Sequence, residues 1–224
     1  GEAGLITRVL APKVEAFLTF ASAAEGAESA PGQVTCREML DLYRFPQINP
    51  QTEVYGVIAK PVGHSMSPAI HNVAFAHQGI DAVYLPLLVE DVRSFVPAFR
   101  AFDVGGYSVT IPHKEAMLGL VDEVEPLVDR IGALNTVVYR GEKAFGHNTD
   151  VAAAVGAIRR ACVQAGWGDG EDVLAGRTVL LVGAGGAGRA LAHGLKAAGA
   201  RLMIANRTLS RAEVLAAEVG ADYC

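Results

Sequence analysis

The chain has 224 residues, 51% hydrophobic and 19% charged, enough to bury the core of one large domain or two smaller ones. Lys and Arg number 19 against 24 Asp and Glu, a net charge of −5 that argues against a nucleic-acid binder or a binder of anionic membranes. The three cysteines have no paired spacing, so neither a disulfide scaffold nor a metal site is predicted.

The two ends and the longest apolar stretch bear on whether the sequence has a signal, a membrane span or a continuation. Residue 1 is glycine and no charged-then-apolar leader follows it, so no signal sequence is predicted. The longest charge-free apolar stretch, residues 178–188, is too short to cross a bilayer. Residues 221–224 resemble the start of another strand, so we expect the chain to be a fragment of a longer polypeptide.

The first elements in the chain form a short segment of their own. We predict a strand around residues 18–20, a polar loop over 25–33 and a helix over 35–43. Thr35 with Glu38 three residues later is the pattern of a capping box at the start of this helix. Pro46 and Pro50 then bracket a stretch without apolar periodicity, so we place a domain boundary after residue 45.

Strands and helices alternate from residue 54 onward. Apolar runs predict strands at 54–59, 83–89 and 106–109, with helices after Pro68 and over 92–102, and a strand pair at 134–139 and 144–147. This order predicts an α/β domain over 46–149 with a largely parallel sheet. A long helix over 149–165 leads to a second unit over 150–224, with strands at 178–182 and 202–205 and helices at 187–198 and 210–219.

A glycine turn lies between the strand at 178–182 and its helix. Gly183, Gly185 and Gly188 satisfy the G-x-G-x-x-G pattern, which lets the backbone N–H groups at a helix N-terminus approach a pyrophosphate. The strand–turn–helix context favours a dinucleotide over a glycine turn that serves only close packing. The predicted contacts are Gly183, Ala184, Gly185, Gly186, Ala187 and Gly188.

The residues that follow the next strand indicate which dinucleotide binds. An NAD site would carry an acid here, but this chain has Asn206, Arg207 and Thr208, with Arg211 one helical turn beyond. Guanidinium groups offer forked donors to phosphate oxygens, so the predicted cofactor is NADP, held through its 2′-phosphate. The alternative is a pair of ordinary solvated arginines at the start of a helix.

Small polar residues also follow the strands of the first α/β domain. Ser65 and Ser67 can offer paired donors to an oxyanion, or they are plain helix N-caps. Lys114 is the candidate for proton transfer, because an ammonium in an apolar cleft has a lowered pKa. Asp150 is either a first-turn acid that complements the helix dipole or the partner of Lys114 in an acid–base dyad.

Six motifs together resemble the shikimate dehydrogenase family in order and spacing: residues 65–68, 109–114, 132–136, 146–150, the glycine turn and 206–208. The resemblance covers residues 53–224 and implies a substrate domain followed by a partial Rossmann doubly wound nucleotide domain. It implies that Ser65, Ser67 and Thr110 bind the shikimate carboxylate and nearby groups. It further implies that Asn135 and Asp150 contact ring hydroxyls and that Lys114 and Asp150 form the catalytic dyad.

Residues 1–45 resemble the C-terminal end of a type I 3-dehydroquinate dehydratase, a (βα)8 barrel, through residues 6–8, 18–20 and 29–33. The resemblance implies that Arg8, Ser29 and Gln33 close over a substrate. That family's Schiff-base lysine and its histidine partner are absent from this segment, so it is not expected to dehydrate substrate alone. The order of the two segments resembles the bifunctional fusion enzyme of plants, which implies a plastid location, or a cytoplasmic one for a different parent.

The resemblance implies NADPH-dependent, reversible reduction of 3-dehydroshikimate to shikimate, with a small molecule and neither nucleic acid nor membrane as partner. Quinate dehydrogenase is an alternative on the same scaffold, although Ser67 and Thr110 leave less room for the extra hydroxyl of quinate. A non-catalytic sensor of quinate is the alternative from another class. It has no reason to retain both Lys114 and Asp150.

Overall fold

The computed structural model describes residues 2–30 and 32–224, so Pro31, part of one quoted motif, lies outside the described residues. The chain divides into two compact units. The first comprises Gly1–Glu123 and Leu134–Gly146, and the second comprises Val124–Ala133 and His147–Cys224. Each unit is an α/β structure with its own sheet, which agrees with the predicted fold class.

The N-terminal segment of the first unit contains only short helices. These are η1 (Glu2–Gly4), α1 (Leu5–Val9), η2 (Pro12–Val14), α2 (Cys36–Asp41) and η3 (Phe45–Gln47). The predicted capping box is confirmed, because Thr35 accepts a hydrogen bond from the Glu38 N–H and the Glu38 carboxylate accepts one from the Thr35 N–H. Helix α2 therefore begins where the sequence indicates.

The predicted strand at residues 18–20 is wrong. These residues have no regular structure, and the nearest β contact is an isolated bridge between Ser22 and Thr35. Phe17, Leu18 and Phe20 are 99%, 57% and 68% exposed. A strand requires a neighbour to accept its backbone hydrogen bonds, and within residues 2–30 and 32–224 no strand pairs with 18–20.

The sheet of the first unit has the order β2-β1-β3-β5-β6-β4. Its strands are β1 (Glu53–Ala59), β2 (Ala82–Leu88), β3 (Val104–Val109), β4 (Glu123–Val124), β5 (Thr136–Arg140) and β6 (Lys143–His147). Strand β1 pairs in parallel with β2 and β3, whereas β5 is antiparallel to β3. The predicted parallel arrangement thus holds for the three strands that the crossover helices connect.

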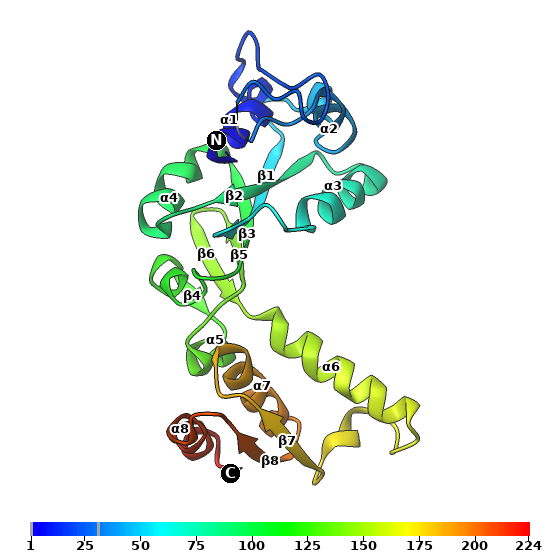
Figure 1. Cartoon of the computed structure of the whole chain (residues 1–224), viewed down its shortest axis with the longest axis vertical. Helices are drawn as coiled ribbons and strands as arrows, with labels where there is room; N and C mark the ends of the chain where they lie inside the picture. Colours follow the sequence, from blue (N-terminus) through cyan, green and yellow to red (C-terminus); the bar gives the residue numbers. More distant parts are fainter. Residues whose placement is uncertain (1, 31) are drawn as a thin grey trace. The chain divides into compact units, whose positions relative to one another are not determined.

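Two crossover helices flank these parallel strands, α3 (Ser67–Gln78) and α4 (Val92–Phe99), which Figure 1 shows on opposite sides of them. Helix α4 continues into η4 (Arg100–Phe102), and η5 (Ala116–Leu120) follows β3. Val54, Ile58, Leu85 and Leu87 are almost fully buried. Burial on both faces explains why β1 and β2 are continuous apolar runs rather than alternating ones.

The second unit is a smaller sheet covered by helices. Strands β7 (Thr178–Val182), β8 (Arg201–Ala205) and β9 (Asp222–Tyr223) are parallel in that order. The helices are α5 (Pro126–Ile131), α6 (Thr149–Gln164), η6 (Glu171–Leu174), α7 (Gly186–Ala197) and α8 (Leu209–Val219), and Figure 1 shows α7 and α8 beside β7 and β8. The strand predicted at the C-terminus is confirmed as β9.

The core of the second unit lies between its sheet and its helices. Leu181 and Ile204 from the strands pack with Leu195 and Leu215 from α7 and α8. The side chains that alternate with them, Leu180, Val182 and Met203, are exposed. Within residues 2–30 and 32–224, no helix is both long enough and apolar enough to span a membrane.

Candidate active site

Three of the predicted polar stretches meet at one edge of the first unit's sheet. Strands β1 and β3 are parallel neighbours, with Ile58 opposite Val109, so the loops that follow them leave the sheet at the same edge. Strand β5 runs antiparallel and begins there, with Thr136 opposite Ser108. The carboxyl edge of parallel strands is where α/β folds place their ligand sites, so this edge is the candidate active site.

Backbone hydrogen bonds fix the loop that carries Thr110 and Lys114. The Thr110 N–H donates to the Ile58 carbonyl at 3.0 Å, and the Leu134 N–H donates to the Lys114 carbonyl at 3.1 Å. The buried ring of His113 lies between these residues, with Nε2 2.9 Å from the Val89 carbonyl oxygen. Thr110 is exposed and Lys114 is half-buried, so both are accessible while their backbone is held.

The two serines lie at the start of α3. The Ser67 N–H donates to Ser65 Oγ at 3.3 Å, and both side chains are half-buried. Met66 is the N-cap of α3, and its own side chain makes no capping hydrogen bond. Neither serine occupies the N-cap position itself, but Ser65 Oγ accepts a backbone N–H of the first turn, as a capping side chain does. Because Ser65 Oγ accepts from the backbone, the Ser65 hydroxyl hydrogen can be donated to another group.

Asn135 is the last of the predicted site residues that lie in the first unit. Its carbonyl accepts a hydrogen bond from the Val109 N–H at 2.7 Å, which places Asn135 beside the end of β3. Its Oδ1 accepts from the Thr136 hydroxyl at 2.9 Å, so the amide is oriented. The structure thus brings Ser65, Ser67, Thr110, Lys114 and Asn135 to one edge of one sheet.

Asp150 belongs to the second unit, in the first turn of α6. Asn148 caps this helix: its Oδ1 accepts from the Val151 N–H, and its amide donates to the Ala133 carbonyl at 3.1 Å. Asp150 is exposed at a place where its charge complements the helix dipole. Its pairing with Lys114 of the first unit stays a prediction.

The glycine turn joins β7 to α7 as the sequence predicts. Gly183 has φ +112°, and an added Cβ at Gly188 would lie 2.1 Å from the Gly183 carbonyl oxygen. Glycine is therefore required at both positions, at one for the backbone conformation and at the other for the close approach. The turn leaves Gly185, Gly186 and Ala187 exposed at the N-terminus of α7, where a helix favours negative charge.

The Asn206–Thr208 stretch lies next to this turn. Asn206 Oδ1 accepts from the Ala184 N–H at 3.1 Å, and its amide donates to the Thr208 carbonyl at 2.8 Å. Asn206 therefore ties the end of β8 to the glycine turn, a role that the sequence pattern did not indicate. Arg207, Thr208 and Arg211 are exposed around the start of α8.

The structure also brings together the three residues predicted for the N-terminal segment. The Ser29 N–H and hydroxyl donate to Gln33 Oε1 at 2.9 and 3.0 Å. Arg8 Nη1 donates to the Gly32 carbonyl, next to Gln33, at 3.3 Å.

Within the described part of the chain, no group of three or more His, Cys, Asp or Glu side chains is arranged to hold a metal ion.

Family models match three stretches of the chain. Residues 1–50 match type I 3-dehydroquinase, residues 57–137 match the shikimate dehydrogenase substrate binding domain, and residues 169–224 match shikimate / quinate 5-dehydrogenase. A match to type I 3-dehydroquinase is therefore followed along the chain by two matches to shikimate dehydrogenase families. In the 3-dehydroquinase segment lie Arg8, Ser29 and Gln33, and in the shikimate dehydrogenase segments lie the sheet-edge residues and the glycine turn.

Known proteins resemble the whole chain or its shikimate dehydrogenase segments. The bifunctional 3-dehydroquinate dehydratase/shikimate dehydrogenase, chloroplastic, of Arabidopsis thaliana is 46% identical over 98% of this chain. Shikimate dehydrogenase from Aquifex aeolicus is 35% identical with a TM-score of 0.70 over 79% of this chain and 64% of its own. Shikimate 5-dehydrogenase from Thermus thermophilus, in complex with NADP(H) and shikimate, is 36% identical with a TM-score of 0.64 over 76% of this chain and 62% of its own.

This chain spans only part of those proteins. It covers 38% of the length of the Arabidopsis relative and less than two thirds of each of the two solved structures. The shikimate dehydrogenase segments nevertheless contain both the sheet edge and the glycine turn. This chain therefore contains the residues of both candidate binding sites, the sheet edge for the substrate and the glycine turn for the cofactor.

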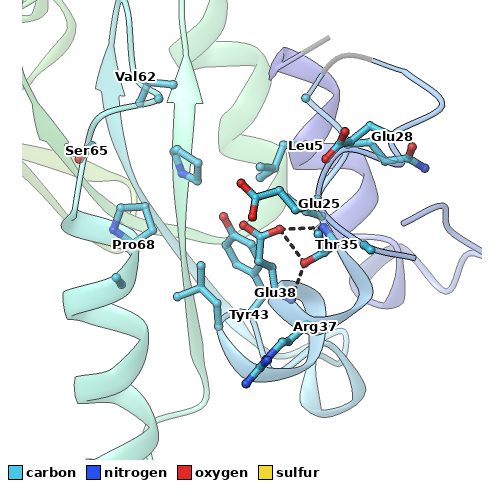
Figure 2. A pocket seen from close by; sticks show the side chains of 18 of the residues that line it. Leu5, Glu25, Glu28, Thr35, Arg37, Glu38, Tyr43, Val62, Ser65 and Pro68 are labelled. Carbon is cyan, nitrogen blue, oxygen red and sulfur yellow. Dashed lines mark hydrogen bonds between the residues drawn. The ribbon is translucent and has the colours of Figure 1, made fainter. Parts of the chain in front are cut away.

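A pocket of about 850 Å³ lies between the 3-dehydroquinase segment and the loop that follows β1. Figure 2 shows Leu5, Thr35 and Tyr43 on one side and Val62, Ser65 and Pro68 on the other. Glu25, Glu28 and Glu38 also line it, against the single cation Arg37 among the lining residues. Burial, and then the Glu38 carboxylate, raise the pKa of Tyr43, so its phenol stays neutral. An acidic lining does not suit a carboxylate ligand, so this pocket is a poor candidate for the shikimate site.

Proposed function

We propose that the protein reduces 3-dehydroshikimate to shikimate reversibly with NADPH. One observation carries the proposal: Ser65, Ser67, Thr110, Lys114 and Asn135 converge on one sheet edge within segments of shikimate dehydrogenase sequence. The names of the relatives, and the NADP(H) and shikimate bound in the Thermus thermophilus structure, support the substrate and the cofactor. We also propose three functional parts, at residues 1–45, 46–149 and 150–224.

The sheet-edge residues supply the groups that such a reaction needs. Hydroxyls of Ser65, Ser67 and Thr110 are donors for a carboxylate, and the amide of Asn135 can bind a ring hydroxyl. The Lys114 ammonium donates a proton to the oxygen of the ketone as it becomes an alkoxide, and its charge stabilises that oxygen. In this proposal Asp150 contacts a ring hydroxyl and pairs with Lys114 as the second member of the catalytic dyad.

The glycine turn fits a dinucleotide. The backbone there has no side chains to obstruct the N-terminus of α7, and Asn206 holds the turn against the end of β8. Arg207 and Arg211 lie exposed where the 2′-phosphate of NADP would be bound, with the Thr208 hydroxyl as a further donor. When bound, the cofactor supplies the hydride, and this chain positions the ketone and supplies the proton.

The test is shikimate-dependent reduction of NADP⁺ by the full-length protein, followed at 340 nm. We expect turnover with shikimate and NADP⁺, a much lower rate with quinate, and a much higher KM for NAD⁺ than for NADP⁺. Faster turnover with quinate would instead assign a quinate dehydrogenase. Tight binding of shikimate or quinate without any turnover would assign a sensor, and equal use of NAD⁺ would remove the role of Arg207 and Arg211.

A second prediction concerns the glycine turn. In Gly188→Ala, the new Cβ has to displace the Gly183 carbonyl, a rearrangement that costs about 1–3 kcal/mol. We expect the Kd for NADPH, measured by fluorescence titration, to rise about tenfold. Gly156→Ala in α6 is the matched control, because its Cβ meets only the flexible end of Arg160. An unchanged Kd in Gly188→Ala would mean that the turn does not bind the cofactor.

The N-terminal segment and the compartment complete the proposal. The match of residues 1–50 to type I 3-dehydroquinase supports a dehydratase activity for the full-length protein, with Arg8, Ser29 and Gln33 binding its substrate. The likeness to a relative named chloroplastic supports a plastid location for the whole protein. We propose small molecules as its partners, and neither nucleic acid nor a membrane, because the net charge is −5.

A further inference from the structure

Tyr84 on β2 is a buried residue whose phenol hydrogen-bonds to Ser108, next to the candidate active site. Its side chain belongs to the core of the first unit, and only 3% of the residue is exposed. The Tyr84 hydroxyl donates a hydrogen bond to Ser108 Oγ, near the end of β3, at 2.7 Å. Neither the sequence pattern nor the motifs single out this residue, because it lies inside a continuous apolar strand.

Helix α3 also holds Tyr84 in place, through its backbone and its ring. Asn72 clamps the Tyr84 backbone, donating to its carbonyl at 2.9 Å and accepting from its N–H at 2.8 Å. The His71 ring stacks on the Tyr84 ring, with centroids 4.2 Å apart and planes 12° from parallel. Both the position and the plane of the phenol ring are therefore set by α3, the helix that begins at Ser67.

Ser67 lies four residues before His71, on the same face of α3. This spacing places the Ser67 side chain toward the hydroxyl end of the Tyr84 ring, near enough that Ser67 lowers the pKa of the phenol. Burial raises the pKa of Tyr84, while the hydrogen bond with Ser108 and then the nearby Ser67 hydroxyl oppose the rise. The phenol therefore stays neutral at physiological pH and keeps its hydrogen for donation.

Three hydroxyls in a row have a fixed number of hydrogens to share. A phenol can donate to one serine and accept from the other, which leaves one serine hydrogen that points out of the network. When Tyr84 donates to Ser67 and accepts from Ser108, the hydrogen that points out belongs to Ser67. A carboxylate bound at Ser67 favours this arrangement, because it needs that hydrogen.

We propose that Tyr84 is a positioning residue that orients the Ser67 hydroxyl for a substrate carboxylate. Tyr84 does not touch the substrate and takes no part in proton or hydride transfer. The inference rests on the proposed function, since it requires that Ser67 bind the carboxylate of shikimate. It adds a buried residue outside the motifs to the determinants of substrate affinity.

The test is Tyr84→Phe in the full-length protein, which keeps the ring and its stacking on His71. We expect the KM for shikimate to rise about three- to tenfold, because one hydrogen bond that orients a donor is lost. The kcat and the KM for NADP⁺ should stay within about twofold, since neither the proton donor nor the glycine turn is altered. In a Ser67→Ala background, Tyr84→Phe should raise the KM less than about twofold further, because the hydroxyl that it positions is gone.

Tyr55→Phe is the matched control, because this tyrosine lies on the neighbouring strand β1 and its hydroxyl donates to Glu53 instead of a serine. We expect no change in its KM for shikimate. An equal rise in both variants, an unchanged KM in Tyr84→Phe, or a rise in the KM for NADP⁺ as well would each overturn the inference. Absence of shikimate turnover by the unsubstituted protein would overturn the proposed function, and this inference with it.

Discussion

Replacing Lys114 with alanine should lower the kcat for shikimate oxidation by roughly 10²–10⁴-fold, the range that a general acid or base contributes. Lys114 is the half-buried cation of the loop after β3, and the hydrogen bond from Leu134 to its carbonyl fixes its backbone. The substitution removes the proton donor and the charge but leaves this backbone contact possible. Shikimate affinity, measured by equilibrium binding, should change far less than kcat.

Lys60→Ala is the control for the loss of a positive charge at the same sheet edge. The Lys60 N–H donates to the Ile111 carbonyl, so this residue lies beside the same loop, but its ammonium forms an ion pair with Glu90. Its kcat should stay within about twofold, because exposed ion pairs contribute little. A near-normal kcat in Lys114→Ala, or an equal loss in both variants, would contradict the catalytic assignment.

The glycine turn and helix α2 were predictable because their signals are local. The strand–glycine–helix pattern at residues 178–198 contains its own turn geometry, and the structure has β7, Gly183 at positive φ and α7 in that order. Helix α2 was likewise predictable from Thr35 and Glu38, which satisfy each other within one turn. In such cases the residues that determine the structure are sequence neighbours.

The failures involve partners that are distant in sequence. Residues 18–20 have the composition of a strand, but a strand forms only where another backbone pairs with it, and its composition cannot reveal whether one is present. Tyr84 is an ordinary apolar-strand residue in the sequence. Its role depends on Ser108, 24 residues away, and on a helix face that the fold brings alongside. The Lys114–Asp150 pair is of the same kind and stays a prediction.

Lys13 shows how the fold joins the two kinds of sequence in the first unit. Its ammonium, with 4% of the side chain exposed, donates to the carbonyls of Pro50 and Thr52 at 2.8 and 2.9 Å and to the Asp103 carboxylate at 3.1 Å. All three of its hydrogens are used. Lys13 lies in the 3-dehydroquinase segment, whereas Asp103 lies in the shikimate dehydrogenase substrate binding domain. The lysine therefore fastens one segment to the other.

Lys13→Ala should lower the free energy of unfolding of this unit by about 3 kcal/mol, because two carbonyls lose a charged donor in a buried place. The loss should not reach the upper end of the range for buried ion pairs, since Asp103 is 78% exposed and can be hydrated. Urea denaturation of the full-length protein measures the change, and hydrogen exchange near residues 50–54 locates it. Lys13→Met, which keeps most of the aliphatic stem, should recover only the packing part of the loss.

Lys143→Ala is the matched control, because this lysine pairs with Glu123 on the surface at 2.7 Å and should leave the urea midpoint nearly unchanged. If Lys13→Met is as stable as the unsubstituted protein, the ammonium contributes nothing beyond its stem. The anchor would then be hydrophobic. If instead Lys13→Ala increases hydrogen exchange on both sides of residue 50, the segments depend on this one cation for their connection, and loosening the 3-dehydroquinase segment will also loosen the strands that carry the candidate active site.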